Sequence, residues 1–303
     1  MVRNGVIMKI VCLGGGHGLA QVLSAIRPLC SNLTAIVATT DNGGSTGRLR
    51  ESQECVALGD IRRCCLQLTD KQSLIHSIFE HRFDGGELDG HSLGNLTLLG
   101  LMQLTDSPTE AVAWFNAMLG NAETILPMSD SATDLVARYN SGEQVIGECE
   151  IDALTELPDN IGLSKAVPAA KGAVDAIMKA DLVLMGPGSI ISSVMPPLLV
   201  KEISTAIKET AACRIFIENI AQENSVASSL QGETIIDWMQ EKLGYQFCDL
   251  SISPQAIEEI VVHCDELNQG QSTQHNIEQL SHVFSQLLKL PLSTKVHSTC
   301  TIN

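Results

Sequence analysis

The stretch that decides the fold is residues 10–19, which read IVCLGGGHGL. Its apolar first half is typical of a buried strand, which we expect over residues 7–13. Glycines follow, and the apolar residues of the segment 19–26 then recur at helical spacing. A glycine turn between a strand and a helix brings backbone N–H groups to the positive end of the helix, where an anion can bind. Such turns are also common where no ligand binds.

This turn fits neither of two common phosphate-binding motifs. It lacks the Lys-Ser/Thr pair that ends a P-loop, which excludes that motif. Gly14 and Gly16 match the first two glycines of the dinucleotide fingerprint, but Leu19 occupies the third position. The mismatch counts against an NAD-dependent redox protein.

Outward from this unit, short apolar runs alternate with longer segments of helical period. We expect further strands at residues 33–39, 181–185, 214–217, 248–252 and 260–263, and helices within 57–104 and at 169–179, 234–243 and 277–288. The alternation is typical of an α/β protein with a Rossmann-like three-layer fold and a mostly parallel sheet. We expect a single domain over residues 1–303, with a small β-hairpin insert near 125–168 and a loose tail near 291–303.

Composition narrows the class of protein. The chain has 303 residues, of which 44% are hydrophobic, so a packed core rather than disorder is expected. It has no uninterrupted apolar run of about 18 residues, so we expect no membrane insertion. We see no signal peptide, and the ten cysteines form no C-x-x-C pair, which fits a cytoplasmic protein without a zinc site. Aromatic residues are only 3%, so the interface of a homodimer would have to be aliphatic.

The net charge of −16 (19 basic minus 35 acidic residues) counts against nucleic acid as a partner. Four arginines nevertheless fall within 16 residues: Arg48, Arg50, Arg62 and Arg63. They predict a local positive patch that suits a small anionic ligand, because arginine grips phosphate oxygens through paired hydrogen bonds. The alternative is a set of ordinary surface arginines.

The segment 39–50, TTDNGGSTGRLR, follows the second expected strand. Ligands of open α/β sheets bind beyond the carboxyl ends of strands, and this is such an end. Asp41 can coordinate Mg²⁺ or accept a hydrogen bond from a ribose hydroxyl, or it can merely cap the turn. The length of the segment and its many donors favour a ligand site.

Three further segments extend the predicted crevice: GDIR at 59–62, HSLGN at 91–95 and GPGS at 186–189. Asp60 is either a helix N-cap or a ligand contact. His91 either donates to a phosphate, moves a proton, or is held by backbone contacts. No catalytic residue, acid–base pair or metal-ligand spacing is evident, which favours a binding protein over an enzyme. The predicted ligand-binding residues are Gly14, Gly15, Gly16, His17, Gly18, Thr40, Asp41, Asn42, Gly43, Gly44, Ser45, Arg48, Asp60, Arg62, His91, Asn95, Gly186, Gly188 and Ser189.

In this order, the segments resemble the gluconeogenesis factor family of YvcK and YbhK, which is related to the 2-phospho-L-lactate transferase CofD. The likeness runs over residues 9–202 and is fainter beyond. It implies a Rossmann-like fold, cytoplasmic location and binding of a UDP-sugar such as UDP-N-acetylglucosamine. It also implies a regulatory part in cell shape and envelope synthesis during growth on gluconeogenic carbon sources.

The resemblance leaves a transferase as the alternative. CofD moves a phospholactyl group from a guanosine carrier onto a deazaflavin, and the transferase branch carries paired acids where this chain has Asp41-Asn42. The single acid weakens the case for Mg²⁺-assisted transfer, because metal–phosphate sites usually rest on more than one anionic ligand. The chain also departs from the family at residues 221–225 and at Gln274-His275-Asn276, where relatives tend to have Arg-His-Asp.

Overall fold

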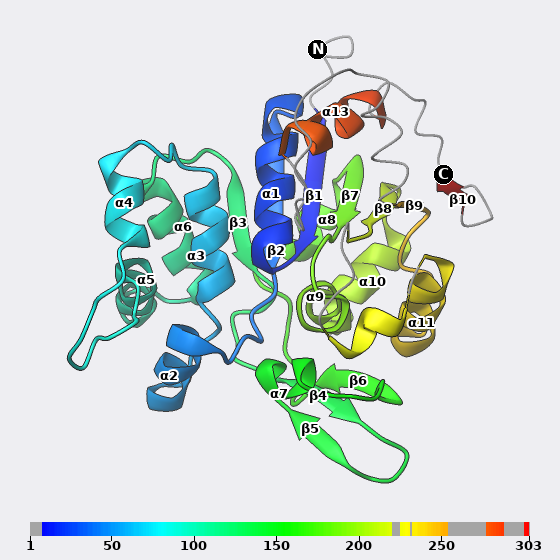
Figure 1. Cartoon of the computed structure of the whole chain (residues 1–303). Coiled ribbons are helices and arrows are strands. Elements are labelled where there is room, and N and C mark those ends of the chain that lie inside the picture. Colours follow the sequence, from blue (N-terminus) through cyan, green and yellow to red (C-terminus); the bar gives the residue numbers. More distant parts are fainter. Residues whose placement is uncertain (1–7, 220–224, 231, 254–276, 288–299, 303) are drawn as a thin grey trace, which may run out of the picture.

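The computed structural model describes residues 8–219, 225–230, 232–253, 277–287 and 300–302. Within these residues, seven strands form one sheet in the order β10-β9-β8-β7-β1-β2-β3, and every neighbouring pair is parallel (Figure 1). The strands are β1 Lys9–Gly14, β2 Asn32–Val37, β3 Thr124–Pro127, β7 Leu182–Met185, β8 Cys213–Ile217, β9 Leu250–Ile252 and β10 Cys300–Ile302. The predicted α/β class and parallel sheet are confirmed.

Strand β1 lies between β7 and β2 and is buried on both faces. Ile10 and Cys12 pack into one hydrophobic cluster, whereas Val11 and Leu13 pack into the other. A strand covered on both faces by helices reads as a continuous apolar run rather than an alternating one. This explains the sequence of residues 10–13.

Helices cover both faces of the sheet and complete three layers. One layer contains α1 Gly16–Ile26, α3 Gly59–Gln67, α4 Leu74–Glu80, α5 Leu93–Leu104, α6 Pro108–Met118 and α13 Ile277–Leu287. The other contains α8 Ala173–Met178, the π-helical turn η2 Ile190–Val194, α9 Met195–Leu199, α10 Lys201–Glu209 and α11 Glu233–Leu243. Short 3-10 turns, η1 Arg27–Leu29 and η3 Val226–Ser229, join these elements. Helix α2, Gly44–Ser52, begins within the second glycine-rich segment, residues 39–50.

The predicted hairpin is confirmed, and the structure adds a third strand to it. Strands β4 Leu135–Arg138 and β5 Gln144–Ile146 form the hairpin, and β6 Asn160–Leu163 pairs with β4 as a third antiparallel strand. The short helix α7, Glu148–Asp152, joins β5 to β6. Figure 1 shows this small sheet beside α2 and outside the main sheet. Residues 124–127, at the start of the range expected for the insert, form β3 of the main sheet and pair with β2.

Two expectations concern the C-terminal part. Residues 260–263 and 291–299 lie outside the described residues. Residues 300–302, expected in a loose tail, are strand β10, because they pair with β9. In the described part of the chain, no single helix is long and apolar enough to cross a membrane. The segments 190–199 and 201–209 reach that length and hydrophobicity only when taken together, and they are bent by 82° to each other.

Candidate ligand-binding site

Two of the predicted glycine segments meet at the carboxyl edge of the sheet. Strands β1 and β7 are paired in parallel, so the turns that follow them lie side by side. A Cβ atom on Gly18 would collide with the carbonyl oxygen of Pro187, and one on Gly15 would lie 3.4 Å from Cβ of Ser193. The beginning of α1 therefore packs closely against the turn after β7, as the sequence predicts.

The β1–α1 turn already has an anionic partner within the chain. The Gly16 N–H donates to Oδ2 of Asp60 at 2.5 Å, and Asp60 also pairs with Arg63 one turn along α3. A Cβ atom on Gly15 would lie 2.6 Å from the same oxygen, so only glycine fits there without a shift. The place where the sequence predicts a phosphate therefore holds a carboxylate.

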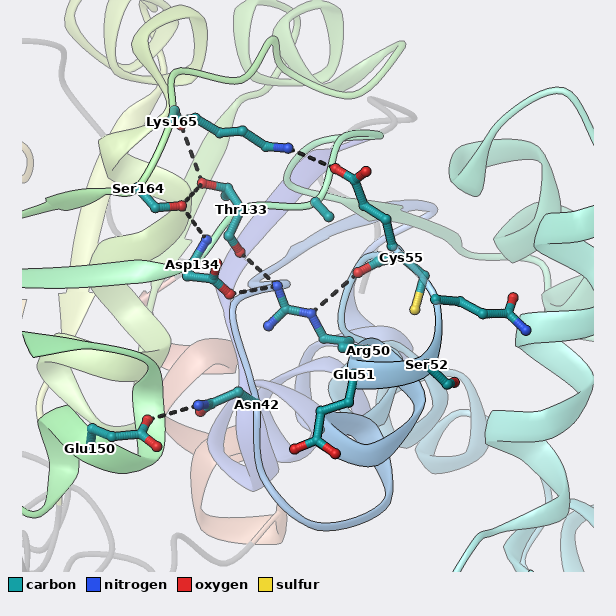
Figure 2. A pocket seen from close by; sticks show the side chains of 14 residues that line it. Asn42, Arg50, Glu51, Ser52, Cys55, Thr133, Asp134, Glu150, Ser164 and Lys165 are labelled. Carbon is teal, nitrogen blue, oxygen red and sulfur yellow. Dashed lines mark hydrogen bonds and ion pairs between the residues drawn. The ribbon is translucent and has the colours of Figure 1, made fainter.

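The β2–α2 turn is held by Asp41 and Arg50. The Gly43 N–H donates to Oδ1 of Asp41 at 2.7 Å. Arg50 donates to four backbone carbonyls, those of Thr40, Asp41, Cys55 and Thr133. It also forms an ion pair with Asp134 at 2.7 Å (Figure 2). Arg50 thus ties this turn to the insert and has little capacity left for a ligand.

A cavity of about 580 Å³ lies between the end of α2 and the insert. Figure 2 shows side chains that line it. Arg50, Thr133 and Asp134 lie at its wall, and Lys165 Nζ reaches Glu54 Oε1 at 2.8 Å across it. Its lining includes no residue of the turns after β1 and β7. The cavity is therefore a feature separate from the crevice at those turns.

A polar cluster lies at the first turn of α2. Oγ of Ser45 is 2.9 Å from Nδ1 of His91 and accepts a hydrogen bond from Asn95 at 3.2 Å, and all three residues are buried. Arg48 follows Ser45 by one turn, is exposed, and donates to the carbonyl of Asp89. Burial, with a smaller effect of the Arg48 charge, lowers the pKa of His91, so its imidazole is neutral at pH 7.

Helix α7 of the insert places three acids against two segments, the β2–α2 turn and the turn after β7. Oε2 of Glu148 accepts from Thr40 at 3.5 Å, and Oε2 of Glu150 accepts from Asn42 at 2.8 Å. Oδ2 of Asp152 accepts from Ser192, in the turn after β7, at 3.3 Å. Together with Asp41 and Asp60, these acids form what we call the carboxylate face: Asp41, Asp60, Glu148, Glu150 and Asp152.

Members of the carboxylate face perturb one another. Burial, and then the charges of Asp41, Asp60 and Asp152, raise the pKa of Glu148 to about 9. Burial also raises the pKa of Asp41 and of Asp152. Because neighbouring, partly buried carboxylates do not all ionise easily, the raised pKa favours the protonated form of Glu148 at neutral pH.

The model of the family described as 2-phospho-L-lactate transferase CofD matches residues 10–292 of this chain. The chain belongs to the CofD family. A gluconeogenesis factor from Halalkalibacterium halodurans is 33% identical over 84% of this chain and 77% of its own length. A Pasteurella multocida relative, to which the same name is given provisionally, is 43% identical over 82% of this chain and 81% of its own length. A crystal structure of a Bacillus halodurans protein matches with a TM-score of 0.78 at 31% identity, covering 82% of this chain and 80% of that one.

The transferase alternative would involve Mg²⁺, so the acids of the site are considered as metal ligands. Among the described residues, no three His, Cys, Asp or Glu side chains are arranged to hold one. Asp41 is engaged by Gly43 and Thr46, and Asp60 by Gly16 and Arg63. The residues present therefore do not fit a Mg²⁺ site, and we derive no metal-assisted step.

Several of the predicted residues of this CofD family member already bond to partners within the chain. Arg62 is 3% exposed and pairs with Glu80 at 2.9 Å. Gly188 exchanges two hydrogen bonds with the side chain of Asn219, and Ser189 caps η2 by accepting from the Ser192 N–H. His17 lies near Arg63 and Asp60, and burial, followed by Arg63, lowers its pKa. Asn42 is drawn to the insert, where it also accepts from the N–H of residue 149.

Sequence reasoning missed Glu148, Asp152, Asn219 and the anchoring role of Arg50. Glu148 and Asp152 are four residues apart in a helix, so they share one face. That spacing is the available signal, but it does not show that the face meets Thr40, more than a hundred residues earlier. The family departures at residues 221–224 and 274–276 lie outside the described residues, whereas Ser225 caps η3.

Proposed function

We propose that this chain binds a nucleotide sugar, such as UDP-N-acetylglucosamine, as a regulatory protein without turnover. The observation that carries the proposal is the polarity of the segment from Thr40 to Arg48. Ser45 and Arg48 lie three residues apart on α2, toward His91 and the loop that carries it. Thr46, on another side of the helix, bonds Asp41 of the carboxylate face.

This polarity suits a ligand that carries both a diphosphate and several hydroxyl groups. Arg48, Ser45 and the N-terminus of α2 offer a positive charge and hydrogen-bond donors to phosphate oxygens. The carboxylate face offers acceptors, and carboxylates commonly bind ribose hydroxyls in Rossmann-like sites. Binding of such a ligand needs only these charges, donors and acceptors, and no catalytic acid–base pair.

The names of the relatives support a physiological setting. Proteins of 33% and 43% identity are called gluconeogenesis factors. We extend this to a cytoplasmic role in cell shape and envelope synthesis during growth on gluconeogenic carbon sources. A nucleotide sugar is a fitting signal for that role, because it is a building block of the envelope.

Native mass spectrometry tests the proposal, with UDP-N-acetylglucosamine, GDP and NAD offered in competition. We expect a selective UDP-sugar adduct. Replacing Arg48 by alanine removes a charged hydrogen-bond donor worth about 1.5–3 kcal/mol, so affinity falls about tenfold or more. Arg82→Ala is the matched control, because Arg82 is also exposed and also donates to a carbonyl of this loop, that of Gly90. Equal losses in both variants would remove Arg48 from the site.

A CofD-like transferase is the second candidate, favoured by the family model that spans residues 10–292. Preference for GDP over the UDP-sugar would support it. Consumption of a nucleotide substrate that depends on Mg²⁺ and is lost in Asp41→Asn would establish it over binding alone.

A further inference from the structure

The N-terminus of α1 differs from an ordinary phosphate site in what already occupies it. An anion at a helix N-terminus is stabilised by backbone N–H groups and the helix dipole. Here Oδ2 of Asp60 accepts from the Gly16 N–H at 2.5 Å and lies against Gly15. The carboxylate thus takes the position that a phosphate oxygen would need.

The surroundings of Asp60 strengthen this effect. Burial raises the pKa of Asp41 and of Glu148, and the charge of Asp60 adds to the rise in each. A diphosphate brought to α1 would therefore meet like charges as well as an occupied N–H group. A hydroxyl group carries no charge and donates a hydrogen bond to a carboxylate, so it is the better partner for this end of the crevice.

We infer that Asp60 is a specificity-determining residue that reserves the α1 end of the crevice for a hydroxyl group of the ligand's ribose or sugar. The diphosphate then lies toward Ser45, His91 and Arg48. This inference rests on the proposed function and gives the ligand an orientation in the site. It also assigns opposite preferences to the two glycine-rich turns.

Asp60 has a structural role as well, because it pairs with Arg63 within α3. The test must therefore separate specificity from stability. Asp60→Asn keeps the size and an acceptor oxygen while removing the charge. Asp175→Asn is the matched control, because Asp175 also lies in the first turn of a helix and pairs with a cation of that helix, Lys179.

The experiment measures the affinities of the full chain and of both variants for inorganic pyrophosphate and for UDP-N-acetylglucosamine by calorimetry. In Asp60→Asn we expect pyrophosphate to bind about tenfold more tightly, since like-charge repulsion is lost. The sugar nucleotide should gain less or lose affinity, so its preference over pyrophosphate falls. Asp175→Asn should leave both affinities unchanged.

An unchanged preference, or weaker pyrophosphate binding in Asp60→Asn, would overturn the inference and place the diphosphate near Asp60. If Asp60→Asn does not fold, Asp60→Ser replaces it, because the serine hydroxyl is smaller, carries no charge and can still accept a hydrogen bond. Failure of the wild-type chain to bind the UDP-sugar would overturn the proposed function instead. The two failures are therefore distinguishable.

Discussion

The β1–α1 and β2–α2 turns both place glycines after a buried parallel strand, but their N–H groups are satisfied from different distances along the chain. The Gly43 N–H bonds Asp41, two residues away. The Gly16 N–H bonds Asp60, which is 44 residues away on α3. The β2–α2 turn is closed locally, whereas the β1–α1 turn depends on the packing of helix α3.

The difference teaches how a glycine-rich turn acquires its ligand preference. Around β2–α2, Asp41 closes the turn itself and Arg50 holds it from outside, so the Ser45 and Arg48 side of α2 faces His91. Around β1–α1, a carboxylate delivered by tertiary structure fills the anion position. Both turns follow a buried parallel strand, and we infer that they nevertheless offer different chemistry to a ligand.

Arg50→Ala should be the most damaging change at the β2–α2 turn. The side chain makes five hydrogen bonds, four to backbone carbonyls and one to Asp134, and only 11% of it is exposed. Losing them should lower the free energy of unfolding by about 3 kcal/mol. Urea denaturation measures this loss.

Glu54→Gln is the control for the same cavity wall. Its partner Lys165 is exposed, so removing this surface ion pair should change stability little. A loss in Glu54→Gln as large as that in Arg50→Ala would show that the cavity, not the turn, depends on these contacts.

Gly15→Ala sharpens the comparison at the β1–α1 turn. The added Cβ meets Oδ2 of Asp60, so we expect a loss of about 2 kcal/mol in denaturation experiments. Gly44→Ala at the other turn has open space but a φ of +47°, and should cost about 1 kcal/mol. Adding Asp60→Ser to Gly15→Ala should recover part of the loss, because the serine lacks the clashing oxygen. Strict additivity in the double variant would contradict the contact.

Glu148→Gln tests the carboxylate face through pH. The folded-state pKa of Glu148 is raised to about 9, well above that of an unfolded glutamate, so the folded chain binds the extra proton. Its contribution to stability is therefore fully present below about pH 4 and is lost as pH rises toward 9. Between pH 5 and 9, the unfolding temperature should fall less steeply with rising pH in Glu148→Gln than in the wild type. Glu150→Gln, on the same helix, is the control, and equal slopes in the wild type and Glu148→Gln would contradict the burial of this proton.

The sequence predicts the parts of this molecule that depend on local pattern. The run over residues 10–13 and the glycines after it define β1, the turn and α1, and Asn140-Ser141-Gly142 marks the hairpin. The partners of the four arginines cannot be predicted in this way, because closeness in sequence does not determine what a long side chain contacts. Arg48, Arg50, Arg62 and Arg63 each have a different partner, namely the Asp89 carbonyl, several carbonyls with Asp134, Glu80, and Asp60.

The carboxylate face shows the opposite limit. Glu148 and Asp152 reach the crevice only because the insert folds back over the β2–α2 turn, where Asn42 and Thr40 receive it. No local period encodes a contact across more than a hundred residues. The sequence therefore contains these acids but does not predict that they lie together.

A crystal structure of the chain with UDP-N-acetylglucosamine tests the central claim most directly. The account predicts the diphosphate beside Ser45 and Arg48, with a ribose or sugar hydroxyl donating to Asp60. A diphosphate bound to the Gly16 N–H, with Asp60 displaced, would contradict it.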